Sequence, residues 1–303
     1  MSRYGLPPVV AALAAAALLA AGCSNGGPAR DTGPARVGVV LTTTGSGAAI
    51  GVSQRTSIRL AGARGLRLSV RDDGGVVSRG AAAVADLVDD GVDVIIGPTL
   101  SNVAREAYTG ADIGEVPMIG IAQTVPALTA FRPYLWRVSM PADLVIPPAV
   151  HEAVRQTKAR SAFVLASRDD VLNRAEAEVF ADSFDDVGVT VVGTAAYVTG
   201  QTDFTAIVAA VQAARPDLLG VAALPVDAVR ALRELRAAGV RAPVVGGNSF
   251  NSSAVVEAAG PAAEELYVGS AWSIDSVDPV SRRFVADWRR RFASDPDQFA
   301  AQA

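Results

Sequence analysis

Two loops of this sequence carry neutral donors that could hold a small anion. Ser101 stands just before a predicted helix at residues 102–111, so its hydroxyl can cap that helix. The hydroxyl and the free amides of the helix start can also bind a ligand carboxylate, and one residue can do both. Gln123 and Thr124 lie in a loop after a predicted strand at residues 116–119. This loop offers a second hydroxyl and backbone groups, although it can equally be a plain turn.

A third loop is rich in glycine and follows the first predicted strand. Gly45, Gly47 and Gly51 have the spacing Gly-x-Gly-x-x-x-Gly, and Asp72 ends the next strand, where the ribose-binding acid of a dinucleotide site would stand. The glycine spacing is wider than in the dinucleotide fingerprint. We therefore favour a turn that brings some ligand close to backbone amides, and a nucleotide-dependent α/β enzyme is the weaker alternative.

Other catalytic chemistry has few side chains to use. His151 is the only histidine, Cys23 the only cysteine and Lys158 the only lysine, and the net charge is −4. A Ser-His-Asp triad or a His-based metal site therefore lacks residues, and no Gly-x-Ser-x-Gly elbow is present. The absence of a basic block argues against nucleic acid as a partner. We expect a binding protein without metal or cofactor, and no enzyme.

The N-terminal residues are typical of a bacterial lipoprotein signal. An apolar stretch at residues 6–21 is followed by Gly22 and Cys23, and it is shorter than the ~20 residues that span a bilayer. The sequence predicts a signal peptide at residues 1–23 with lipid on Cys23, then a flexible tether at residues 24–36. The mature protein would be extracytoplasmic and lipid-anchored to the cell membrane. Ordinary secretion is the alternative.

Beyond the tether, short apolar runs alternate with alanine-rich helical stretches. Strands that are apolar throughout and separated by helices indicate parallel sheets with helices on both faces. A proline-bearing segment at residues 137–148 interrupts the series, which suggests two similar α/β lobes. The first lobe is predicted at residues 37–139 plus 273–303, and the second at residues 140–272. The predicted strands are residues 37–41, 66–71, 94–96, 116–119, 162–166, 190–197, 218–222 and 244–245.

In parallel sheets a ligand lies beyond the carboxyl ends of the strands. With two lobes, these ends can face each other across a cleft. The loops that would line such a cleft are residues 42–50, 72–77, 97–101, 120–124, 167–173, 223–226 and 246–250.

Several short motifs occur in a characteristic order along the chain. They are Val37-Gly38-Val39-Val40-Leu41 with Thr44-Gly45, Val70-Arg71-Asp72-Asp73, Val94-Ile95-Ile96-Gly97-Pro98 with Ser101, Ala122-Gln123-Thr124-Val125-Pro126, Thr202-Asp203-Phe204 and Pro243-Val244-Val245-Gly246-Gly247. Their order resembles that of the type I periplasmic binding proteins, in particular the leucine/isoleucine/valine-binding proteins of ABC importers. The resemblance implies capture of a small ligand between two lobes and its delivery to an ABC permease.

The resemblance also implies roles for residues of the first lobe. Ser101 and Thr124 would meet the α-carboxylate of an amino acid, and the backbone at Ala122 and Gln123 would help to hold its α-ammonium. Neutral donors at a helix start agree with this physically, because they stabilise an anion without burying a cation.

Three positions of the second lobe depart from the family pattern. Leu172 and Leu224 stand where aromatic residues are common, and Asn248 stands where an acid pairs with the ligand ammonium. A neutral Asn can accept a hydrogen bond but lacks the charge that makes such pairs strong. The expected ligand is therefore a branched-chain or related amino acid, an amide or a small carboxylate.

Relatives continue beyond residue 303, by roughly 60 to 80 residues that would complete both lobes through short connections. The chain is therefore expected to be truncated at the C-terminus or to be a naturally short variant. A sensor that reports a ligand to a receptor, and a lipoprotein that has lost binding, are the remaining alternatives to a transport protein.

Overall fold

The computed structural model describes residues 33–61 and 65–303. Residues 35–303 form one compact unit. The predicted signal peptide, the lipid-bearing Cys23 and residues 24–32 of the predicted tether lie outside the described residues, and these assignments stay predictions.

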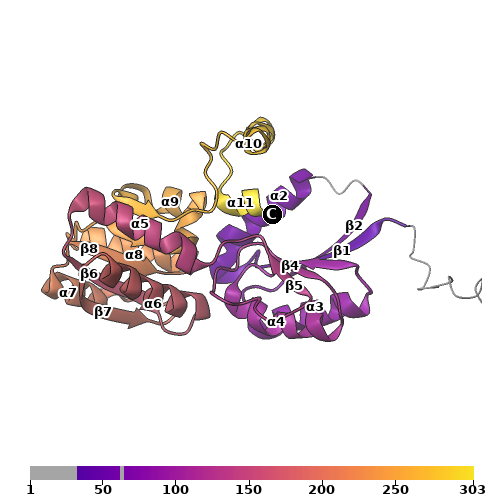
Figure 1. Cartoon of the computed structure of the whole chain (residues 1–303), viewed down its shortest axis with the longest axis horizontal. Helices are drawn as coiled ribbons and strands as arrows, with labels where there is room; N and C mark the ends of the chain where they lie inside the picture. Colours follow the sequence, from indigo (N-terminus) through magenta and orange to yellow (C-terminus); the bar gives the residue numbers. More distant parts are fainter. Residues whose placement is uncertain (1–32, 62–64) are drawn as a thin grey trace, which may run out of the picture. The chain divides into compact units, whose positions relative to one another are not determined.

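The first lobe is built on a five-stranded sheet of order β2-β1-β3-β4-β5, in which all neighbours run parallel (Figure 1). A 3-10 turn, η2 (Gly45–Gly47), follows the first strand. The strands are β1 (Ala35–Leu41), β2 (Leu66–Asp72), β3 (Val94–Ile96), β4 (Met118–Gly120) and β5 (Leu135–Arg137), and the helices are α2 (Ala48–Ala61), α3 (Val77–Asp89) and α4 (Ser101–Ile113).

The second lobe repeats this plan with a five-stranded parallel sheet of order β10-β9-β8-β6-β7. Its strands are β6 (Ser161–Ser167), β7 (Thr190–Tyr197), β8 (Leu218–Ala222), β9 (Val244–Gly246) and β10 (Leu266–Val268). Its helices are α5 (Ala142–Thr157), α6 (Val171–Asp186), α7 (Thr205–Ala214), α8 (Pro225–Ala237) and α9 (Ser253–Ala259), with the 3-10 turns η3 (Asn248–Asn251) and η4 (Gly260–Ala263). Helices α10 (Pro279–Phe292) and α11 (Gln298–Gln302) follow.

Neighbouring side chains of the buried strands point alternately to the two faces of each sheet, and each face packs against its own hydrophobic core. In β1, Val39 and Leu41 pack with Ile58 of α2, whereas Val40 joins the core formed by α3 and α4. Successive side chains of a strand point to opposite faces, so a strand covered on both sides must be apolar at every position.

The second sheet has the same two layers. Phe163 and Leu165 of β6 pack with α7, α8 and α9, and Val164 packs with α5 and α6. Phe180 and Phe184 of α6 stack at 6.2 Å between ring centroids. This arrangement confirms the predicted fold class of two parallel-sheet α/β lobes.

The predicted element boundaries are correct within a few residues, including those of α5, whose predicted helix at residues 144–156 forms despite Pro147 and Pro148. Strands β5 and β10 were missed because Trp136, Arg137 and Tyr267 interrupt the aliphatic run that indicated the equally short strands β3 and β9. Helices α9 and α10 were also missed.

Glycine ends three of the helices, as their sequence position indicates. Gly91, Gly188 and Gly239 have φ of 69°, 71° and 81°. This left-handed conformation is the usual one just past a helix C-terminus, where glycine has no steric penalty.

The final helix packs on the first lobe. Helix α11 contacts α2, and the hydroxyl of Ser53 in α2 donates a hydrogen bond to Asp297, which caps α11 through the amide of Ala300. The assignment of residues 273–303 to the first lobe, and the boundary between residues 139 and 140, stay predictions.

Gly51 is the position where α2 approaches the end of β1 most closely. A Cβ there would lie 1.9 Å from the carbonyl oxygen of Thr42. We expect Gly51→Ala to lower the free energy of unfolding by about 3 kcal/mol, because backbone on both sides must move. Urea unfolding measures this loss.

Gly110→Ala in α4 is the matched control. Its Cβ would meet Val84 at 3.3 Å and the amide nitrogen of Ala85 at 4.0 Å, and alanine favours the helix by about 1 kcal/mol. Equal destabilisation by the two substitutions would contradict the close approach at Gly51.

Candidate functional site

A small cavity lies where the carboxyl ends of the two sheets meet. Its volume is about 10 Å³, close to the room that one water molecule needs. The first lobe contributes Ile50, Thr99, Leu100, Ser101 and Ala122, and the second contributes Asp170, Leu172, Leu224, Asn248 and Ser249. Five of the seven binding residues expected from the sequence therefore line one cavity, and Gln123 and Thr124 directly follow Ala122 in the chain.

Ser101 has a different local role from the predicted helix cap. Leu100 occupies the cap position with extended backbone angles, and Ser101 is the first residue of α4. The Ser101 hydroxyl makes no cap hydrogen bond and has no partner among the described residues, although it is buried. The cap prediction is wrong because the chain enters the helix one residue earlier. The hydroxyl is thereby left available to a ligand.

Thr124 presents a second hydroxyl of the same kind. Its side chain is 2 % exposed and its Oγ1 has no partner in the described part of the chain. Buried polar groups without a partner are uncommon and costly, because they have lost water without gaining a protein hydrogen bond. Two such donors near one cavity indicate a place where something else completes the hydrogen bonding.

Residues at and just beyond the end of β5 hold the loop that carries Thr124. Arg137 donates to the carbonyl of Val125 at 2.7 Å, and the hydroxyl of Ser139 donates to the carbonyl of Gln123 at 2.6 Å. Both side-chain polar atoms of Gln123 are buried without a partner. The backbone of this loop is therefore fixed, while the side chains of Gln123 and Thr124 are not committed to it.

The second lobe presents acids to the cavity. Asp170 lines it and is 3 % exposed, and its Oδ1 accepts the amides of Leu172 and Asn173 at 3.0 Å each. Burial raises the pKa of Asp170. Glu176 lies farther along α6, where burial raises its pKa to about 8 although it accepts the amide of Asn248 at 2.8 Å. The sequence analysis assigned neither acid a role, and its only signal was the position of Asp170 in loop 167–173.

Asn248 connects the two lobes. Its Nδ2 lies 3.4 Å from the carbonyl oxygen of Ala122, and its Oδ1 accepts Nε2 of Gln298 at 3.0 Å. Oε1 of Gln298 in turn accepts the hydroxyl of Ser270 at 2.8 Å and the amide of Ala271 at 2.7 Å. A chain of two carboxamides therefore joins the cavity to α11 and to the segment that leaves the second lobe.

Apolar side chains complete the walls of the cavity. Ile50 and Ala122 form a buried cluster with Phe299 of α11, and Leu100 with Val103 packs against Leu224 from the other lobe. Leu172 is 6 % exposed. The apolar part of the lining has no aromatic side chain among the described residues.

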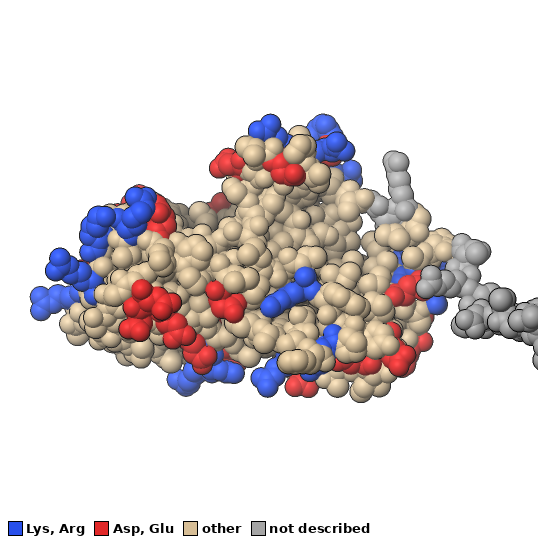
Figure 2. Space-filling view, viewed as in Figure 1, with Lys and Arg blue, Asp and Glu red and all other residues tan. Residues whose placement is uncertain are grey.

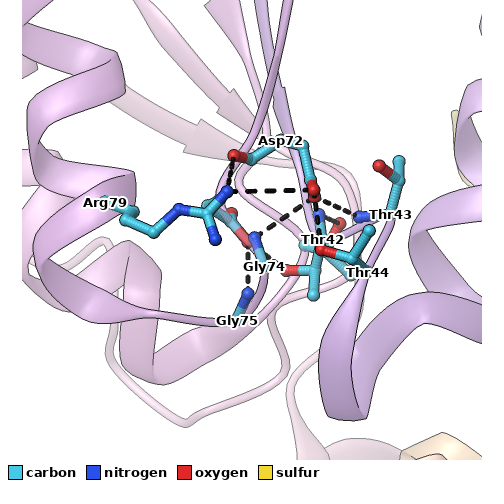
Figure 3. A network of polar contacts seen from close by, with 9 residues as sticks. Thr42, Thr43, Thr44, Asp72, Gly74, Gly75 and Arg79 are labelled. Atoms are coloured by element: carbon cyan, nitrogen blue, oxygen red, sulfur yellow. Dashed lines mark hydrogen bonds and ion pairs between the residues drawn. The ribbon is translucent and has the colours of Figure 1, made fainter.

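The glycine-rich loop is organised by Asp72 (Figure 3). Its carboxylate accepts the amide of Thr43 at 2.8 Å, the hydroxyl of Thr44 at 2.7 Å and the amide of Gly74 at 3.2 Å. Arg79 donates to the main-chain oxygen of Asp72 at 3.1 Å. The Asp72 carboxylate is thus engaged by the loop after β1 and by Gly74 of its own turn, which removes the observation that suggested a ribose-binding acid.

The acid-base behaviour of Asp72 tests this network. Burial alone would raise its pKa, but the hydrogen bonds from Thr44, Thr43 and Gly74 lower it to about 2. A depressed carboxyl pKa stabilises the fold above the unfolded-state pKa of about 4, and this contribution is lost as the pH falls towards 2.

We therefore expect Asp72→Asn to destabilise the protein at pH 7 by about 1 kcal/mol, allowing for partial exposure. The difference from the wild type should shrink between pH 4 and pH 2, as measured by urea unfolding. Asp86→Asn, on the exposed side of α3, is the control. A difference that persists unchanged at pH 2 would refute the assignment.

Gln298→Ala should remove the centre of the carboxamide chain. It leaves Oδ1 of the buried Asn248 without its donor and the part-buried amide of Ala271 without its acceptor, so we expect a loss of about 1–3 kcal/mol in unfolding free energy. Gln302→Ala on the same helix is the matched control, because Oε1 of Gln302 makes no hydrogen bond to described residues. Equal losses in the two variants would show that the chain contributes no stability.

Within residues 33–61 and 65–303, no group of three or more His, Cys, Asp and Glu residues is arranged to hold a metal, and no helix has the length and apolarity required to cross a membrane. His151, the only histidine of the sequence, is exposed on α5.

Known proteins show the same architecture. A family model described as "Periplasmic binding protein" matches residues 34–303. The structure of a leucine-binding protein, LivK, from Thermotoga maritima has a TM-score of 0.84 at 21% identity, over 88% of this chain and 79% of that one. None of the curated proteins matches the chain.

Two further solved structures are similar at the level of the fold. LivJ, a branched-chain amino acid transporter substrate-binding protein from Streptococcus pneumoniae in complex with isoleucine, has a TM-score of 0.82 at 22% identity, over 88% of this chain and 80% of that one. A solute-binding protein of an ABC transporter from R. palustris, in complex with benzoate, has a TM-score of 0.81 at 21% identity, over 89% and 77%.

Proposed function

Because this chain belongs to the periplasmic binding protein family, we propose that it captures a small carboxylate-bearing solute and delivers it to an ABC importer. The family consists of solute-binding proteins rather than enzymes. The ligand would be a branched-chain or related amino acid, an amide or a small carboxylate.

The observation that carries the proposal is the pair of unpartnered hydroxyls. Ser101 and Thr124 are both about 2 % exposed and neither hydroxyl meets a described acceptor or donor. Ser101 is also the first residue of α4. The free amides at a helix N-terminus carry partial positive charge and favour an anion. A ligand carboxylate would supply acceptors for both hydroxyls without a buried cation.

The apolar walls agree with a ligand that has a small aliphatic part. Ile50, Leu100, Leu172 and Leu224 line the cavity. Burial of such a group contributes roughly 25 cal/mol per Å². The structural relatives that carry ligands hold isoleucine in one case and benzoate in another, and both molecules combine a carboxylate with an apolar body.

Ligand entry requires the lobes to separate, because the cavity of about 10 Å³ admits no amino acid. The chain crosses between the lobes after β5, near residues 138–141, and again beyond β10, near residues 269–275. We propose that these crossings are hinges and that the ligand stabilises the closed form by contacting both lobes.

The proposed location is outside the cytoplasm, with lipid on Cys23 as the anchor and an ABC permease as the partner. On the face shown in Figure 2, acidic and basic side chains are interspersed, including over α10. Nothing on that face resembles the single-sign surface of a nucleic-acid-binding protein. A receptor that reads the closed form is the alternative partner, and it would use the same cavity.

Ser101→Ala and Thr124→Ala test the proposed site. Each removes one donor to the ligand carboxylate, so we expect each to weaken binding about tenfold. The measurement is isothermal calorimetry or thermal shift on residues 24–303, with branched-chain amino acids, amides and small carboxylates as ligands. Ligand at about 100 times Kd should raise the wild-type stability by ~2.7 kcal/mol.

Ser183→Ala is the matched control, because the hydroxyl of Ser183 is buried in α6 and donates to the carbonyl of Val179. It should leave ligand affinity unchanged. Full affinity in both the Ser101 and Thr124 variants would remove these residues from the binding site.

A further inference from the structure

The two lobes offer the cavity polar groups that favour ligand charges of opposite sign. The first lobe supplies the free hydroxyl of Ser101 and the start of α4, which both favour an anion, and Thr124, two residues after the lining residue Ala122, has a second free hydroxyl. The second lobe supplies the carboxylate of Asp170. A donor side and an acid side that meet at one small cavity favour a solute that carries both signs of charge.

Asp170 has acceptor capacity left over after its structural role. Both of its hydrogen bonds, from the amides of Leu172 and Asn173, go to Oδ1 and cap α6. No hydrogen bond from a described residue reaches Oδ2. A carboxylate offers about four lone-pair sites, so one oxygen can serve the helix while the other faces a ligand.

Asp170 forms no ion pair with a described residue, and Arg174 is the cation that acts on its pKa, which it lowers. Arg174 is exposed, and its Nη1 donates to the carbonyl of Arg168. Asp169 is exposed and accepts the amide of Thr199, and Glu176 is a second buried acid on the same helix. Burying a carboxylate without a paired cation is costly, and burial accordingly raises the pKa of Asp170. A bound cation would relieve this cost.

The carboxamide of Asn248 is already engaged on both sides. Its Nδ2 lies at the carbonyl of Ala122, and its Oδ1 accepts from Gln298. To bind a ligand ammonium, Oδ1 of Asn248 would have to give up the hydrogen bond from Gln298. The neutral carboxamide cannot offset that loss with the charge attraction that an acid would provide. The acid that the family pattern predicts at position 248 is therefore missing, and the charge is available from a different loop.

We infer that Asp170 binds a positively charged group of the ligand and so selects amine-bearing carboxylates over plain carboxylates. This inference rests on the proposed function, because it needs the same cavity and the same carboxylate contacts. Asp170 is then a specificity-determining residue, while Ser101 and Thr124 hold the anion common to both kinds of ligand.

The test compares pairs of ligands that differ only in the amine. L-Valine is paired with 3-methylbutanoate and L-leucine with 4-methylpentanoate, and calorimetry gives Kd for each with the wild type and with Asp170→Asn. Asparagine is as good a helix cap as aspartate and keeps an oxygen for the two amides, so the variant should fold.

We expect the wild type to bind an amino acid more tightly than its amine-free partner, by on the order of tenfold to a hundredfold. Asp170→Asn should abolish this preference and leave the affinity for the plain acid unchanged or higher. Asp169→Asn, which removes the neighbouring exposed charge, should keep the wild-type preference.

Each other outcome contradicts a defined statement. A wild type that binds the plain acids as tightly as the amino acids, or an Asp170→Asn variant that keeps the preference, overturns the role of Asp170 and leaves the proposed function intact. Failure of the wild type to bind any of the four ligands overturns the inference, and failure to bind amides and other small carboxylates as well overturns the proposed function.

Discussion

Polar groups at the carboxyl edges of two buried sheets must find partners, and this requirement governs the whole structure. A parallel sheet covered on both faces exposes its functional loops only at one edge. Where two such edges close on each other, water is excluded and each polar atom needs a protein partner or a ligand. Asp72 and Gln298 find partners in the protein. The hydroxyls of Ser101, which lines the cavity, and of Thr124, two residues after the lining residue Ala122, do not.

The need for hydrogen-bond partners also distinguishes side chains that fix the loops of the site from side chains that remain free to bind a ligand. Asp72 fixes the loop after β1, and Arg137 and Ser139 fix the backbone of the loop after β4. These contacts preorganise the loops, which reduces the ordering cost of binding. Asn248 and Gln298 add a link between the lobes, so that closure and the placement of α11 depend on one run of hydrogen bonds.

Much of the fold could be predicted from the sequence, because its signals are local. Apolar runs such as residues 218–222 indicate strands covered on both faces, and Gly91, Gly188 and Gly239 mark helix ends through their left-handed backbone. Strands β5 and β10 lack such a continuous aliphatic run, and their place is set by pairing with β4 and β9. Ser101 was assigned to a cap because residue type cannot tell whether a helix begins at residue 101 or 102.

The sequence by itself determined the fold class, because the alternation of strands and helices is a local pattern, and the family resemblance named five of the residues that line the cavity. Only the tertiary structure decided which polar atoms are left without partners, that Asp72 is committed to the loop after β1, and that Asp170 and Gln298 belong to the site. Those properties depend on distances between residues far apart in the chain, such as 248 and 298 or 122 and 248, and no local pattern encodes such distances.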